Sequence, residues 1–347
     1  MTSAEAPIRP RLRPAEDDYR ELKARVVAAG LLERQPGYYI LKTAFTLSLY
    51  AAVPAILLVS QSVWVVVGDA VLAGFALGQL GLLGHDFGHR QSNRPGRLND
   101  FMCLLIAPVL LGFSRAWWMD KHNRHHSHPN VLDRDPDIGI AAISFTPEQA
   151  RQKTGVIRWL NRYQAFLFFP ALLFEGIHLR LESIRYLARN PTRFRKTELV
   201  LMALGTAAAV WFVVAVLGPW LALLFVAISQ GLYGVYLGSI FAPNHKGMPV
   251  LEREDELDFF RRQVITARNV HANAFHDFWY GGLNYQIEHH LFPNMPRNKL
   301  REAQRIVRAF CAERNVEYYE TGMLRSYREV LMALHTSSAP LREIFEY

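Results

Sequence analysis

Apolar residues gather into four long runs along this chain. The runs cover Leu41–Ser60, Ser62–Leu83, Leu199–Leu217 and Trp220–Phe241. Each is close to the roughly 20 residues that a helix needs to cross a bilayer. Only a short turn separates the two runs of each pair, so the pattern predicts four transmembrane helices in two hairpins. We therefore expect an all-α integral membrane protein.

The polar segments divide the chain into three expected parts. Residues 1–40 form a cytosolic or interfacial N-terminal segment, with helical character from Ala15 to Leu32. Residues 41–297 form the membrane domain. Residues 298–347 form a cytosolic C-terminal helical segment, whose first helix begins near Arg297 and ends near Arg314.

Two segments between the hairpins contain many apolar residues but are not predicted to cross the membrane. Phe101–Phe113 is too short to cross a bilayer, so we expect it to be buried or re-entrant. Phe166–Arg189 mixes apolar and charged residues at helical spacing, which is typical of a helix lying in the membrane interface.

The positive charge predicts the orientation of the spans. The net charge is +8, and basic residues precede the first span, fill the stretch from Arg90 to Lys196 and follow Lys246. The turns Gln61-Ser62 and Gly218-Pro219 carry no charge. Since Lys and Arg are retained on the cytoplasmic side, both hairpins should insert from the cytoplasm, with the first span as an uncleaved anchor. The basic face suits anionic headgroups, an acidic electron carrier or the phosphates of an acyl thioester, and gives no reason to expect nucleic-acid binding.

Histidines supply the candidate chemistry. Eight of the thirteen occur in four places that the predicted topology brings to the cytosolic ends of the spans, as a cap over the membrane helices. They are His85 and His89 in HDFGH, His122, His125 and His126 in HNRHH, His245 in PNHKG, and His289 and His290 in QIEHH. An i, i+4 spacing places two imidazoles on one helix face, and in HNRHH two rings can point to one side while the third turns toward a neighbouring metal.

Eight imidazoles exceed the four or so ligands of one structural zinc, so two metal ions sharing the set is the simplest interpretation. Zinc, copper, iron and nickel all accept imidazole. Each motif alone has a plainer explanation: a surface HxxxH pair, a polar turn at HNRHH, or a helix cap at His245. The two cysteines, Cys103 and Cys311, are isolated and encode no redox pair or iron-sulfur cluster, so electrons must come from outside the chain.

The motifs HxxxH, HxxHH and QxxHH resemble the three histidine boxes of the membrane fatty acid desaturase superfamily, over roughly Leu41 to Arg297. Gln286 stands where many members have His, a variant similar to front-end and related bacterial acyl desaturases. The resemblance implies an oxidoreductase that removes two hydrogens from an acyl chain with O2, at two iron ions held by the eight histidines. Three roles are open for Gln286: it could bind metal, form a hydrogen bond to a ligand, or merely face the site.

Other residues near the boxes have supporting roles in this hypothesis. Candidates for further metal ligands, or for groups that orient the imidazoles, are Asn244, Asp86 and Glu288. Candidates for orienting the imidazoles are also Asp135 and Asp137, although Asp135-Pro136-Asp137 could equally be an ordinary turn. A narrow apolar tunnel should hold the acyl chain beside the metals. Its candidate lining residues are Trp117, Trp118, Tyr236 and Trp279, which could equally serve membrane packing and interfacial anchoring.

The chain contains no HPGG haem motif of a fused cytochrome b5 domain, so we expect a separate ferredoxin or cytochrome as electron donor. The acyl carrier could be CoA, acyl carrier protein or lipid, with CoA or lipid preferred. A membrane hydroxylase or alkane monooxygenase is the alternative enzyme. A metal transporter or receptor is the alternative of another class, but it should place polar groups across the bilayer midplane, where only Asp69, Gln79 and Gln230 occur.

Overall fold

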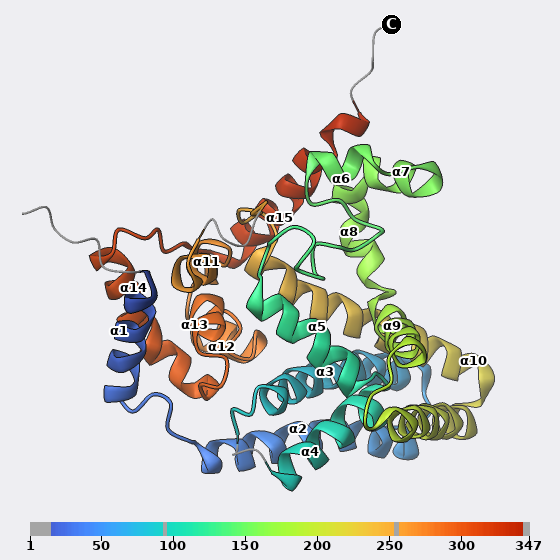
Figure 1. Cartoon of the computed structure of the whole chain (residues 1–347). Helices are drawn as coiled ribbons and strands as arrows, with labels where there is room; N and C mark the ends of the chain where they lie inside the picture. Colours follow the sequence, from blue (N-terminus) through green and yellow to red (C-terminus); the bar gives the residue numbers. More distant parts are fainter. Residues whose placement is uncertain (1–14, 93–95, 253–256, 343–347) are drawn as a thin grey trace, which may run out of the picture.

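The computed structural model describes residues 15–92, 96–252 and 257–342 (Figure 1). These residues are mostly helical, which confirms the helical character expected from the sequence. The strands within them are short: β1 (Asn269–Val270) pairs in parallel with β2 (Glu320–Thr321).

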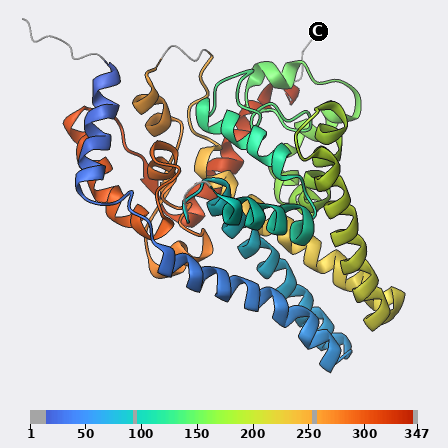
Figure 2. The same ribbon diagram turned by 60° about the horizontal axis from the view of Figure 1, so that its bottom comes forward.

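Within the described ranges, three helices are long and apolar enough to cross a membrane: α2 (Pro36–Val59), α3 (Val63–Gly88) and α10 (Arg195–His245). Gly218, directly before Pro219, interrupts α10 with a left-handed backbone (φ 71°). Helix α10 therefore consists of two helical halves, which match the third and fourth apolar runs of the sequence. Figure 2 shows the α2–α3 turn and the α10 bend reaching the same end of the molecule, at the lower right.

Helix α3 packs closely against α10 because glycines remove side chains from the contact. A Cβ on Gly78 would overlap the ring of Tyr236, and one on Gly74 would lie 2.9 Å from the carbonyl oxygen of Ser229. The C-terminal half of α3 is accordingly buried, while much of α2 remains exposed. Close packing fixes the height of the C-terminal ends of α3 and α10 relative to each other, and both ends carry histidines.

Two helix pairs are sharply bent. α4 (Arg97–Leu104) continues into the π-helical turn η1 (Leu105–Leu111), which meets α5 (Arg115–Ser127) at 107°. The bend uses Gly112 (φ 74°), and the Ser114 hydroxyl caps α5 by accepting from the backbone N–H of Trp117. If each bent pair counts as one span, up to five candidate spans are present.

The segment predicted as one interfacial helix is the second bent pair. α8 (Gln164–Leu172) and α9 (Glu175–Arg189) meet at 81°. The bend falls where the apolar part gives way to the charged part. Helix α8 contacts α10 and α15, and α9 contacts α10 and α5. These tertiary contacts hold as two helices a segment whose spacing of apolar residues predicted a single helix.

The remaining elements gather at the other end of the long helices (Figures 1 and 2). They are α1 (Ala15–Ala28), α6 (Pro147–Arg151), α7 (Gly155–Arg162), α11 (Phe259–Ile265), α12 (Ala274–Trp279), α13 (Gln286–Leu291), η3 (Arg297–Lys299), α14 (Leu300–Glu313), α15 (Met323–Ser337) and η4 (Ala339–Leu341). Helices α1, α11, α13 and α14 share one apolar core. Arg314 ties α14 to α1 through Asp18 (2.8 Å) and Glu21 (2.5 Å). This core holds the short helix α13, which carries the third histidine motif.

Candidate metal centre

Four helices bring the eight histidines together. His85 lies in the last turn of α3 and His89 caps that helix, whereas His245 is the last residue of α10. The HNRHH motif lies in the C-terminal half of α5, and the last motif lies on α13. Among the described residues, none of the candidate metal-binding groups includes the remaining histidines, which are His128, His178, His271, His276 and His335.

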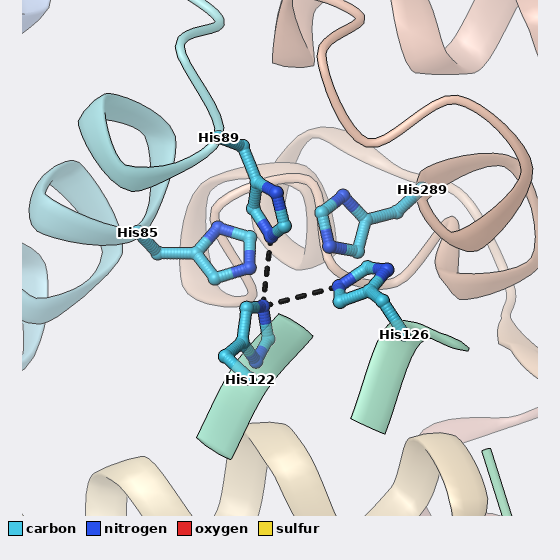
Figure 3. Close-up of side chains that lie close together, drawn as sticks. All are labelled: His85, His89, His122, His126 and His289. Atoms are coloured by element: carbon cyan, nitrogen blue, oxygen red, sulfur yellow. Dashed lines mark hydrogen bonds between the residues drawn. The ribbon is translucent and has the colours of Figure 1, made fainter. Parts of the chain in front are cut away.

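Five imidazoles form the first cluster, consisting of His85, His89, His122, His126 and His289 (Figure 3). One nitrogen from each lies within 4.8 Å of the others. The Nε2 atom of His122 is 2.8 Å from that of His89 and 3.1 Å from that of His126. The rings thus converge on one point from α3, α5 and α13.

Three imidazoles form the second cluster, consisting of His125, His245 and His290. The Nε2 atom of His245 is 3.3 Å from that of His125 and 3.0 Å from that of His290. The two neighbouring clusters share α5 and α13. In α5 the i, i+4 pair His122 and His126 faces the first cluster and His125 faces the second, as helical spacing allows.

The geometry of both clusters fits metal ligation. Metal–imidazole bonds of about 2.0–2.1 Å place neighbouring ligand nitrogens about 3 Å apart, close to the contacts here. Buried nitrogens that lack hydrogen-bond partners include His85 Nε2 and both ring nitrogens of His289. Burial, together with neighbouring imidazoles, lowers the pKa of His289 and of His290 well below the usual value. These rings are therefore neutral and offer lone pairs to a metal ion.

The second ring nitrogens of the second cluster are held by the protein. His125 Nδ1 lies 3.0 Å from both carboxylate oxygens of Asp135. His245 Nδ1 donates to the carbonyl oxygen of Thr266 (2.9 Å), and His290 Nδ1 donates to Gln263 Oε1 (2.8 Å). Such contacts fix the tautomer and orientation of a ligating imidazole and leave Nε2 for the metal.

A network of two carboxylates, of which Asp135 is buried, lies beside His125 on the side away from the cluster. Asp135 also accepts from the backbone N–H groups of Asn130 and Asp137, each at 2.8 Å. Asp137 in turn contacts the ammonium of Lys121. Burial would raise the pKa of Asp137, but the charges of Lys121, His125 and Lys246 outweigh it and hold that pKa well below the usual value. The network therefore presents negative charge to the back of His125.

Gln286 lies at the second cluster. Its side-chain amide is 2.9 Å from His245 Nε2, and its Oε1 accepts from Asn244 Nδ2 at 3.0 Å. Asn244 Oδ1 is buried without a partner. Because the oxygen and nitrogen of an amide are assigned from the surrounding hydrogen bonds, either atom of Gln286 can face the cluster.

Asp86 and Glu288 contact polar side chains of neighbouring segments more closely than they contact the imidazole rings. Asp86 pairs with Arg297 at 2.6 Å and lies 3.7 Å from His85 Nδ1. Glu288 accepts from Asn269 Nδ2 (2.7 Å) and the Tyr318 hydroxyl (2.8 Å). Both carboxylates thus join the histidine motifs to neighbouring segments.

The predicted tunnel residues lie in different places. Trp118 stacks on His122 with ring centroids 4.5 Å apart, whereas Trp117 packs in the core between α3 and η1. Tyr236 and Trp279 contact each other, also at 4.5 Å. A cavity of about 290 Å³ beside His245 is lined by other residues, including Phe145, Lys246 and Leu334. The role of these four aromatic residues as a tunnel stays a prediction.

Sequence reasoning missed three contributors to the site. Gln263 and Thr266 hold His290 and His245, and Arg297 pairs with Asp86. Each is a single polar residue outside any histidine motif. The only signal for Gln263 and Arg297 is burial of a polar or charged side chain, and Thr266 acts through its backbone carbonyl oxygen, so all three require the tertiary structure.

Residues 62–322 match the model of a family described as fatty acid desaturase. Among similar proteins, an acyl-lipid (9-3)-desaturase from Physcomitrium patens is 31% identical over 91% of this chain and 62% of its own length. A Delta(6)-fatty-acid desaturase from Caenorhabditis elegans is 30% identical over 92% of this chain and 74% of its own length. A Delta(5) fatty acid desaturase from the same organism is 30% identical over 88% and 71%. The chain thus spans under two thirds of the relative from Physcomitrium patens and about three quarters of the two from Caenorhabditis elegans.

Proposed function

The chain belongs to the fatty acid desaturase family, which confirms the resemblance seen in its histidine motifs, and from this premise we propose that it removes two hydrogens from adjacent carbons of a fatty acyl chain. The observation that carries the proposal is the convergence of eight imidazoles into two adjacent clusters. The reaction consumes O2, two electrons and two protons, and yields an alkene and two water molecules.

Two iron ions are the cofactor that we assign to these clusters. His85, His89, His122, His126 and His289 would hold one ion, and His125, His245 and His290 the other. Gln286, whose side-chain amide lies 2.9 Å from His245 Nε2, would turn its amide oxygen toward the smaller set and complete it, directly or through a bound water. Bound iron would supply the O2-activating redox chemistry that side chains lack.

The protein's own residues hold the site rigid and partly dry. Asp135, Thr266 and Gln263 orient the three rings of the second cluster. His289 and His290 are fully buried on α13, and Trp118 stacks over His122. Positioning of an acyl chain against such a preformed site is the main contribution available to the protein.

We further propose the arrangement of the chain in the membrane. α2, α3 and the two halves of α10 would form four spans in two hairpins, with the histidine-bearing cap on the cytoplasmic face. The basic segments beside the spans support this orientation. The electron donor would be a separate ferredoxin or cytochrome. The substrate would be an acyl-lipid, as the name of the relative from Physcomitrium patens says of that protein, or an acyl-CoA.

Metal content and product mass test the proposal together. Purified protein should contain about two irons per chain. With reductant, ferredoxin and labelled oleoyl substrates presented as phospholipid and as CoA ester, it should yield a product lighter by two hydrogens. His125→Ala should lower iron content and abolish turnover while membrane insertion persists. A product heavier by one oxygen would establish a hydroxylase instead, and one zinc or no metal would favour a transporter or receptor.

A further inference from the structure

The side chain of Lys42, near the N-terminal end of α2, points toward the protein interior. It lies in the second turn of α2, where its neighbours Ile40 and Leu41 are 68% and 72% exposed. The side chain of Lys42 is only partly exposed, and its Nζ donates to Gln79 Oε1 at 3.0 Å. A lysine near the end of a span usually extends its ammonium outward to the interface, so the inward direction needs a reason.

A buried hydrogen-bond chain fixes the acceptor of Lys42. Gln79 Nε2 donates to the Tyr236 hydroxyl at 2.7 Å, and that hydroxyl donates to the carbonyl oxygen of Trp279 at 2.8 Å. Gln79 and Tyr236 are 0% and 5% exposed. The amide of Gln79 is thereby oriented with its oxygen toward Lys42, and the ammonium is held in one place.

Aromatic rings surround the ammonium. Nζ lies 5.4 Å from the ring centroid of Phe45 and 5.1 Å from that of Phe278, and both rings are partly open to the surface, at 46% and 41% exposure. Phe278 belongs to α12, whose Trp279 has a buried indole N–H without a partner. The ammonium of Lys42 thus lies beside an aromatic rim, formed by Phe45 and Phe278, at the start of a predicted span.

Lys42 forms no ion pair with a carboxylate in the part of the chain that the structure describes, and the charged groups that act on it, Asp86 and Arg297, pair with each other. Its polar contact is the neutral amide of Gln79, so an ammonium with three donors has two left. Lys121, another partly covered lysine, contacts the carboxylate of Asp137 instead. A partly desolvated cation is stabilised by a nearby anion. Because the described protein residues supply none that pairs with Lys42, we expect a bound ligand to supply the anion.

We propose that Lys42 binds the phosphate of a glycerophospholipid whose acyl chain is the substrate. The inference rests on the proposed function and specifies its acyl carrier. Gln79 precedes His85 on α3 by six residues, or about 9 Å along the helix axis, which is shorter than an acyl chain. A lipid held at Lys42 would therefore bring carbons near its headgroup, rather than its terminal methyl group, toward the first cluster. The exposed apolar side chains of Ile40, Leu41 and Phe45 offer a surface for its second chain.

Lipid binding by native mass spectrometry tests the inference without turnover. Detergent-purified protein is incubated with dioleoyl phosphatidylglycerol, dioleoylglycerol or oleoyl-CoA. Lys42→Gln should lower the occupancy of the phospholipid about tenfold, the loss of one charge-assisted hydrogen bond, and leave that of dioleoylglycerol unchanged. Lys42→Arg should keep most of the binding. The matched control is Lys196→Gln, which removes an exposed cation near the start of α10 and should change nothing.

Two results would overturn the inference. One is equal phospholipid occupancy in Lys42→Gln and Lys196→Gln, which would make Lys42 an ordinary interfacial lysine. The other is a selective loss of oleoyl-CoA, which would assign the cation to a CoA phosphate. Unchanged iron content and elution volume in Lys42→Gln show that lost binding does not reflect unfolding. Failure of the proposed function is separate, since it would appear as absent turnover of the wild-type protein with every carrier.

Discussion

Replacement of Asp135 by Asn tests how the second cluster is held. The carboxylate accepts from three donors, namely His125 Nδ1 and the backbone N–H groups of Asn130 and Asp137. An Asn side chain has one acceptor oxygen and one NH2 group. Because each carboxylate oxygen already faces a backbone N–H, either orientation of the amide sets its NH2 group against a donor.

The magnitude follows from these contacts. Losing a charge-assisted hydrogen bond to His125 costs about 1.5–3 kcal/mol, and a buried N–H left unsatisfied costs about 1–3 kcal/mol. Loss of a group that orients a metal ligand typically weakens metal affinity about 10–100-fold. Asp135→Asn should therefore release iron at a chelator concentration about 10–100-fold lower than the wild type. Iron per chain is measured by mass spectrometry after dialysis against graded chelator.

Asp133→Asn is the matched control for this change. Asp133 lies two residues away, is exposed and has a left-handed backbone (φ 61°) that Asn adopts readily. It should retain iron like the wild type. If Asp135→Asn kept its iron at the same chelator concentration as Asp133→Asn, the assignment of Asp135 to hold His125 would be refuted.

Three further predictions concern stability. Arg297→Met should lower the free energy of unfolding by about 3–5 kcal/mol, because it leaves buried Asp86 without its counterion. Arg297→Lys keeps the positive charge and is the control. Equal melting temperatures of the two variants would contradict the prediction. Gly234→Ala should cost about 1–3 kcal/mol in chemical denaturation, since its Cβ would overlap the carbonyl oxygen of Leu172, whereas Gly68→Ala has open space and should cost nothing. Iron removal by chelator should lower the melting temperature. The corresponding loss of unfolding free energy is about 2.7 kcal/mol when free iron had been 100-fold above its Kd, and an unchanged melting temperature would argue against metal at these histidines.

The apolar runs predicted the long helices closely because their signal is local. A run of about 20 apolar residues specifies a helix through its own composition, and α2, α3 and the halves of α10 follow the four runs. The break at Gly218-Pro219 was also readable, since glycine adopts positive φ and proline disfavours helix continuation. The bend between α8 and α9 was not readable, because it depends on contacts of α8 with α10 and α15.

The sequence by itself determined which imidazoles share a helix face, since i, i+4 spacing aligns His85 with His89 and His122 with His126. Only the tertiary structure decided that His125 meets His245, 120 positions away, and that Thr266, Gln263 and Arg297 serve the site. The physical reason is that helical spacing is a property of a few consecutive residues. The partner of a buried polar group is selected by packing between distant segments, where every such group must find a donor, an acceptor or a metal.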